Sequence, residues 1–167
     1  MNKTISILII SGSIISIGFG IWHFFVPGIW NWYSYIDQKA TELVLAIRAI
    51  NFFFSLLLVL LGIANVIFVC VKSIDKIARI TLFSISSFLW ASRIVMQIIY
   101  PQGSQNPILQ NSMFSVFVLT FLCFSIALLY LITNKSLTEN VMITIKNISR
   151  KMVKLIRLMP FNDISHK

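Results

Sequence analysis

Charged residues are scarce in this chain, and acidic ones most of all. Only 11% of its 167 residues are charged, with five Asp or Glu against fourteen Lys or Arg. A soluble domain of this length needs more charge than that to cover its surface. The apolar residues, 57% of the chain, fall in blocks of about twenty, the length that crosses ~30 Å of hydrocarbon. The sequence therefore predicts an integral membrane protein.

Cysteine and histidine are also sparse, with two residues of each. Cys70 and Cys123 belong to different predicted spans and are offset by roughly 15 Å along the bundle axis, too far for a disulfide. No C-x-x-C pair, zinc ligand set, haem pair, metal cluster or flavin motif is visible. His23 has no acidic partner on its own helix, so no nucleophile–base pair is predicted. We therefore expect that the chain is not catalytic on its own.

Four long apolar runs predict an all-α fold, an antiparallel bundle with short connections. The bundle occupies residues 1–132 and a basic tail follows at 133–167. A cleaved signal peptide is the competing interpretation of the N-terminus, because Lys3, Gly18 and Gly20 fit its pattern, but the apolar run continues past Gly20. The four predicted spans are Ile5–Val26, Leu43–Val71, Ile80–Tyr100 and Ser112–Ile132.

The basic residues predict the orientation of the bundle. One precedes the first span, three lie between the second and third, and seven follow the fourth, whereas Lys39 stands alone on the other side. Short loops rich in Lys and Arg stay in the cytoplasm, so both termini are predicted to be cytoplasmic. The net charge of +9 is explained by this bias and by attraction to an anionic inner leaflet, and it predicts no nucleic-acid partner.

Aromatic residues crowd the stretch GIWHFFVPGIWNWYSYI, Gly20–Ile36, at the predicted outer face. Trp and Tyr concentrate at membrane–water boundaries because their rings are apolar while their N–H or O–H groups need water. Pro27 is expected to end the first span. We predict an interfacial aromatic belt formed by Trp22, Trp30, Trp32, Tyr33, Tyr35 and Tyr100.

The belt does not explain the ionisable groups beneath it. His23, Arg48 and Arg93 lie on three different spans, at depths of about 5, 8 and 10 Å below the predicted outer ends. Polar neighbours at helical spacing place each group on one face of its span, and charged groups in membranes normally face the bundle interior or a wet cavity. We therefore predict a polar pocket open to the outside, with the ligand-binding residues His23, Arg48, Asn51, Trp90, Arg93 and Gln97.

Two interpretations of these residues stay open. Arginines near a helix end can reach back to lipid headgroups, and His23 can donate to a carbonyl, which would make the chain a structural scaffold without a ligand. Guanidinium groups with no acid inside any span instead favour an anion or electron-rich carbonyl oxygens. A quinone or an anionic lipid headgroup would fit such a pocket.

The tail carries a further pattern. Apolar residues from Val141 to Met159 lie on one side of a helical wheel, and Pro160 ends the pattern. We predict an amphipathic helix in the cytoplasmic interface that binds anionic lipid, or alternatively docks a cytoplasmic protein partner. Its membrane-surface basic residues are Lys146, Arg150, Lys151, Lys154 and Arg157.

The segment GIWHFFVP has the form G-x-x-H-F-x-x-P and ends the first of four spans. In this it resembles the DoxX-like family of small bacterial four-helix membrane proteins, with Gly20, His23, Phe24 and Pro27 at the matching positions. The likeness covers the layout of Ile5–Pro101 and the octapeptide in detail. Span two lacks the acidic residue of many relatives, so no acid–base role is carried over. The resemblance implies a quinone- or redox-related accessory subunit of the bacterial cytoplasmic membrane, since some members are linked to thiosulfate–quinone oxidoreduction or to redox-stress complexes.

Overall fold

The computed structural model describes residues 2–101, 106–133 and 146–152. Four long helices account for most of these: α1 (Lys3–Ile29), α2 (Thr41–Cys70), α3 (Lys76–Ile99) and α4 (Pro107–Thr133), with a short 3-10 helix, η1 (Trp32–Tyr35), after α1. Each long helix has the length and apolar composition needed to cross a membrane. The predicted all-α four-helix bundle is confirmed, and the chain is a small multi-pass membrane protein.

The helices extend beyond most of the predicted limits. The expectation that Pro27 ends the first helix was wrong, because Pro27 lies inside α1 and the helix continues to Ile29. Proline lacks only its own N–H, which would have bonded to the carbonyl of His23. The helical hydrogen-bond pattern continues three residues later, where the Trp30 N–H donates to the Val26 carbonyl at 3.0 Å.

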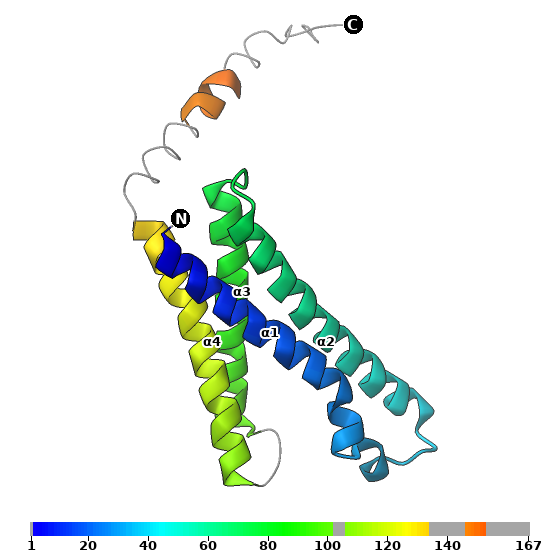
Figure 1. Ribbon diagram of the computed structural model, residues 1–167. Coiled ribbons are helices and arrows are strands. Elements are labelled where there is room, and N and C mark those ends of the chain that lie inside the picture. Colours follow the sequence, from blue (N-terminus) through cyan, green and yellow to red (C-terminus); the bar gives the residue numbers. More distant parts are fainter. Residues whose placement is uncertain (1, 102–105, 134–145, 153–167) are drawn as a thin grey trace, which may run out of the picture.

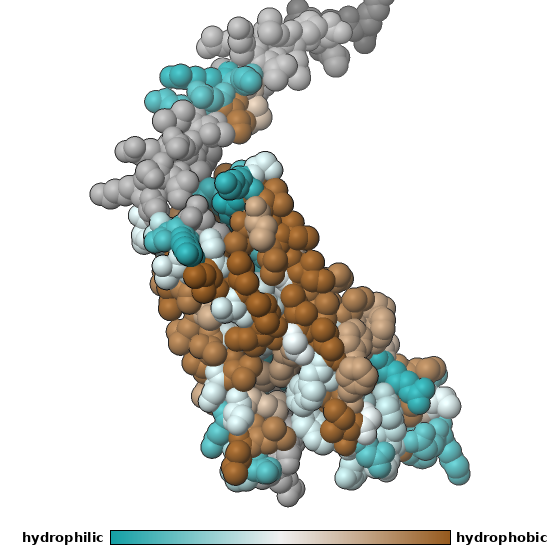
Figure 2. Space-filling view, viewed as in Figure 1, coloured by the Kyte–Doolittle hydropathy of each residue, from teal (hydrophilic) through white to brown (hydrophobic). Residues whose placement is uncertain are grey.

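The chain runs up and down, so its connections alternate between two ends of the bundle (Figure 1). The end that carries the α1–α2 and α3–α4 connections is called the aromatic end, because Trp30, Trp32 and Tyr100 lie there. The opposite end carries Lys3, the α2–α3 connection and the end of α4, and is called the basic end. On the face seen in Figure 2, the surface between the two ends is broadly apolar, whereas hydrophilic residues gather at both ends.

Helix α1 is the centre of the bundle. It packs along α2 on one side and along α4 on the other, while α3 packs mainly on α4. Glycines permit the close approach to α2: a Cβ added at Gly20 would lie 2.9 Å from the Ser55 carbonyl oxygen, and one at Gly62 would lie 2.6 Å from Ile17. Small residues in such positions are typical of tight helix pairs in membranes.

The core is rich in aromatic residues. Phe83, Trp90, Phe117 and Phe124 are almost completely buried between the helices. The indole N–H of Trp90 donates to Ser16 Oγ at 2.9 Å, which links α3 to α1. This bond satisfies a donor that would otherwise be buried without a partner.

Helices α2 and α3 touch only sparsely along their length, and polar bonds hold them together at the basic end. Asn65 Nδ2 donates to Ser86 Oγ at 2.8 Å, and both residues are fully buried. The guanidinium of Arg79 donates to the carbonyls of Phe68 and Val71 at 3.0 and 2.9 Å. Arg79 thereby caps the last turn of α2, whose carbonyls lack partners within the helix. We call these two contacts, Asn65 with Ser86 and Arg79 with the end of α2, the joint between α2 and α3. From the joint the two helices diverge toward the aromatic end (Figure 1).

The tail is described only in part. Residues 146–152 are helical and exposed, and they include Lys146, Arg150 and Lys151. Lys154, Arg157 and the rest of the predicted amphipathic helix lie outside the described residues. The division of the chain into a bundle at 1–132 and a tail at 133–167 stays a prediction.

Candidate functional site

A cavity of about 590 Å³ lies at the aromatic end, where α2 and α3 have diverged. We call it the α2 cavity. Parts of α1, η1, α2 and α3 form its walls, so residues far apart in the sequence meet there. Its lining is mostly apolar and contains no acidic side chain; it consists of His23, Trp32, Tyr35, Ile36, Ile47, Ile50, Asn51, Phe54 and Arg93.

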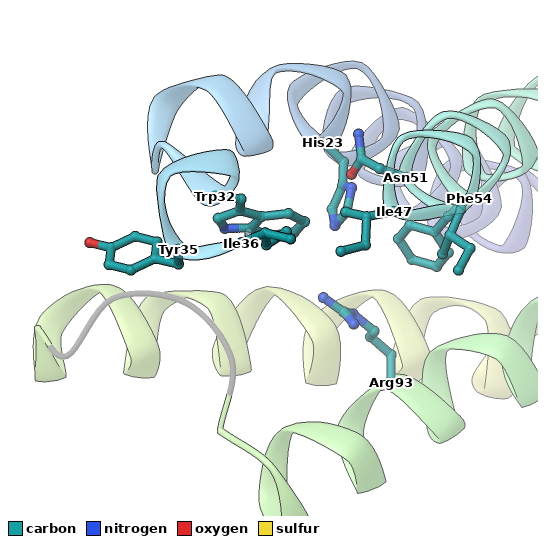
Figure 3. Close-up of a pocket in the computed structure, with 9 residues that line it drawn as sticks. His23, Trp32, Tyr35, Ile36, Ile47, Asn51, Phe54 and Arg93 are labelled. Atoms are coloured by element: carbon teal, nitrogen blue, oxygen red, sulfur yellow. The ribbon is translucent and has the colours of Figure 1, made fainter. Parts of the chain in front are cut away.

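Arg93 is the cationic residue of this site. It extends from α3 toward the pair formed by α1 and α2, and its guanidinium points into the space beneath His23 and Trp32 (Figure 3). The guanidinium carbon lies 5.1 Å from the ring centre of Phe117, 5.5 Å from that of Phe54 and 5.8 Å from that of Phe19. Attraction to these ring faces stabilises a charge away from water. The site therefore holds a guanidinium in a predominantly aromatic setting.

His23 faces the cavity from the last turns of α1. Its Nδ1 lies 3.4 Å from Ser55 Oγ, and Ser55 donates its own proton to the Asn51 carbonyl at 2.6 Å. Because a hydroxyl has one proton, the contact with His23 is made when the Nδ1–H donates to Ser55. In a neutral imidazole this leaves Nε2 as an acceptor. Phe54 packs edge-on against the ring at 4.8 Å.

Asn51 adds a second polar group from α2. Only 8% of the residue is exposed, and its Oδ1 is buried without a hydrogen-bond partner among the described residues. The side chain lies beside the imidazole of His23 (Figure 3). Buried polar atoms in native proteins nearly always have a partner, and the imidazole of His23 is the polar group beside this oxygen.

A second cavity, of about 410 Å³, lies on the other side of Arg93. We call it the α4 cavity, because its walls include Met113 of α4 together with Trp22 and Trp30. It shares His23, Trp32 and Arg93 with the α2 cavity. These three residues therefore form the partition between two hollow regions of the aromatic end.

The predicted aromatic residues differ in exposure; Tyr33 is partly exposed beside Arg48, and Tyr35 lines the α2 cavity. Trp22, Trp30 and Trp32 are only partly exposed; Trp22 packs edge-on against Trp30 at 5.5 Å, and all three wall the cavities. Tyr35 and Tyr100 are 85% and 64% exposed, as an interfacial role requires. That role stays a prediction for the whole set.

The structure brings together three of the six predicted ligand-binding residues, His23, Asn51 and Arg93. Trp90 and Gln97 are buried but line neither cavity, since Trp90 is engaged with Ser16. Arg48 is exposed and lies outside both cavities, with its guanidinium carbon 4.9 Å from the ring centre of Tyr33. Arg48 therefore belongs to the surface of the aromatic end.

The predicted site did not include Phe54 or three isoleucines of the lining, Ile36, Ile47 and Ile50. Phe54 could have been predicted, because it follows Asn51 by three residues and so shares its helical face. Ile47 and Ile50 could not, since an apolar residue of a span looks the same whether it faces lipid, a neighbouring helix or a cavity, and Ile36 lies in the connection between two spans.

The polar groups of this site are few and come from three helices and η1. The cavity is lined by a guanidinium, an imidazole, an amide and an indole, within otherwise apolar walls. Among the described residues, no three His, Cys, Asp or Glu side chains come together as a metal site would require. Comparison of the chain with protein-family models, with curated proteins and with solved structures finds no match.

Proposed function

We propose that this chain is a binding or accessory subunit of a membrane complex, and that the α2 cavity holds the oxygen-bearing head of a quinone or of an anionic lipid. The observation that carries this proposal is the position of Arg93, whose guanidinium projects from α3 into a cavity of about 590 Å³ shared with His23 and Asn51.

The lining supports an acceptor-rich ligand. The guanidinium of Arg93 can only donate hydrogen bonds, and none of the described residues that line the cavity is a carboxylate. Planar apolar walls from Trp32 and Phe54 suit a flat or apolar body behind the polar head. Carbonyl oxygens and phosphate oxygens both meet these requirements.

The setting of this subunit is part of the proposal. The resemblance of Gly20, His23, Phe24 and Pro27 to the DoxX-like pattern supports a redox-related complex in the bacterial cytoplasmic membrane. The distribution of basic residues supports cytoplasmic termini, with the aromatic end outside. The exposed helical residues 146–152 agree with a basic tail on the anionic inner leaflet.

A second candidate function is a structural scaffold without a small-molecule ligand. The rings of Phe19, Phe54 and Phe117 around Arg93 favour it, because cation–π contacts can hold an arginine in place without a ligand. Under this alternative, replacement of Arg93 lowers the stability of the bundle and changes nothing that is bound.

Native mass spectrometry of the detergent-purified chain separates the two candidates. We expect the wild type to retain a quinone or phospholipid and Arg93→Gln to lose at least nine-tenths of it. Arg48→Gln is the matched control, because it removes the same charge from the same end of the bundle but outside the cavity. Equal retention by all three proteins, or no retention by the wild type, would overturn the proposal.

A further inference from the structure

A third hollow feature lies between α2 and α3, nearer the basic end than the α2 cavity. It is a groove of about 510 Å³, which we call the α2–α3 groove. All of its walls are apolar, and several of them are open to the surroundings: Leu57, Leu60 and Ile85 are each more than half exposed. The lining residues are Phe53, Leu56, Leu57, Leu60, Leu61, Ala64, Ile85 and Leu89.

The groove lies next to the α2 cavity, between the same two helices. On α3, Ile85, Leu89 and Arg93 follow one another at four-residue intervals, so groove and guanidinium share one face. Leu89 of the groove and Phe54 and Arg93 of the cavity also line one small void. The two hollows are therefore neighbours, with the polar one nearer the aromatic end and the apolar one below it.

The closed joint between α2 and α3 sets the length of the groove. Asn65 bonds to Ser86 directly beyond Ala64, the last α2 residue of the groove. From Phe53 to Ala64 the groove follows about 16 Å of helix at 1.5 Å per residue. The groove is therefore about as long as one leaflet of the ~30 Å hydrocarbon core is thick, and because it starts below Arg93 it extends past the middle of the bilayer.

We infer that the α2 cavity and the α2–α3 groove form a single site for one bilayer phospholipid, with its phosphate at Arg93 and one acyl chain in the groove. This inference rests on the proposed function and names the ligand class. A phosphate suits the head position because the cavity offers several donors and no acid. The second acyl chain stays in the bilayer, since the groove is open along its side.

Photolabelling of the wild-type chain locates the acyl chain directly. The probe is a phosphatidylglycerol with palmitoyl chains and a diazirine at the end of one chain, incorporated into nanodiscs with the protein. We expect crosslinks concentrated on Leu57–Ala64 and on Ile85–Leu89. Crosslinks spread evenly over the lipid-facing residues of all four helices would overturn the inference.

A second experiment tests the inference by blocking the groove. Leu57→Trp places a large ring in the groove, whereas Ile63→Trp is the matched control, because Ile63 is also exposed on α2 but lines none of these hollows. We expect Leu57→Trp to weaken retention of dipalmitoyl phosphatidylglycerol about tenfold and to leave retention of the dihexanoyl form unchanged. Equal retention of the long-chain lipid by both variants contradicts the groove.

The outcomes separate this inference from the proposed function. Arg93→Gln should weaken both lipids equally, because it removes the contact to the head. If the wild type retains a quinone in preference to phosphatidylglycerol, the inference fails while the proposed function stands. If it retains neither, both fail. Matching melting temperatures for Leu57→Trp and Ile63→Trp exclude misfolding as the cause of a difference.

Discussion

Helix α2 meets its two helical neighbours in opposite ways. Against α1 it packs tightly, through Gly20 and Gly62, along much of its length. Against α3 it is joined at the basic end and separates toward the aromatic end, where the hollows open. The difference follows residue size: glycine and serine face α1, whereas leucine and phenylalanine face the gap. In a membrane, where lipid tails are as apolar as leucine, close packing holds helices together and large apolar residues do not.

The two arginines of α3 repeat this contrast. Arg79 and Arg93 are fourteen residues apart, so they lie within about 40° of one another around the helix. Arg79 donates to two carbonyls at the end of α2 and closes the joint. Arg93 projects into a cavity among aromatic rings. The same kind of side chain on the same helix thus closes a helix contact at one end and lines a cavity at the other.

The largest expected loss of stability comes from a substitution that disrupts the tight interface between α1 and α2. Gly20→Leu should cost about 3 kcal/mol of unfolding free energy, because its Cβ alone would meet the Ser55 carbonyl at 2.9 Å. Gly18→Leu is the control, since nothing lies within 4 Å of its added Cβ. Unfolding in mixed micelles, followed by circular dichroism, measures both. Equal stabilities would show that α1 and α2 do not depend on this close approach.

The next largest loss of stability is expected when the contact between α2 and α3 at the basic end is weakened. Arg79→Ala should cost about 1–2 kcal/mol, because two charge-assisted bonds to the carbonyls of Phe68 and Val71 are lost from a partly exposed site. Lys72→Ala removes an exposed positive charge at the same end and should change stability little. We expect Arg93→Gln to cost less than Arg79→Ala; the reverse order would contradict the division of roles between the arginines.

A smaller energy is expected for the buried hydrogen bond between Asn65 and Ser86, which belongs to the same joint. A double-mutant cycle of Asn65→Ala and Ser86→Ala should give a coupling energy between about 0.6 and 1.7 kcal/mol, the range for polar contacts between membrane helices. The same cycle between Asn65 and Thr120, which bonds to the Val116 carbonyl of its own helix α4, should give almost none. A coupling near zero for Asn65 and Ser86 would mean that the joint depends on Arg79 alone.

The smallest effect concerns the exposed arginine. Arg48→Gln should cost about 0.5 kcal/mol, the usual value for an exposed cation–π contact, because its guanidinium lies over Tyr33. The companion variant Tyr33→Leu should remove the same contribution, so the double variant should be no worse than either single one. Strictly additive losses would indicate that Arg48 and Tyr33 act separately.

The spans and their alternation were predictable from the sequence, because hydrocarbon thickness and the spacing of apolar blocks leave little choice. The inward face of α2 was predictable as well: Asn51, Ser55, Gly62 and Asn65 recur at helical spacing and are all buried. Patterns within one helix were sufficient for these features, since burial in a bundle follows the periodicity of each helix.

The composition of the site was harder to predict, since it depends on where neighbouring helices end. Arg48 lies near the polar face of α2, but its guanidinium lies over the ring of Tyr33 in η1 and the residue is exposed, outside both cavities. Trp90 was expected in the pocket and instead bonds to Ser16 on α1. Divergence of α2 from α3, which creates the cavity, has no signature within either helix alone.

The bond from Trp90 to Ser16 also bears on how the protein is made. The hairpin of α1 and α2, which packs through Gly20 and Gly62, is complete in the sequence at Cys70. Trp90, which donates to Ser16 on the other face of α1, is twenty residues further along, and Phe124 of α4, which packs on Gly12, is further still. During synthesis from the N-terminus, this second face of α1 can therefore be covered only after the first hairpin has been made.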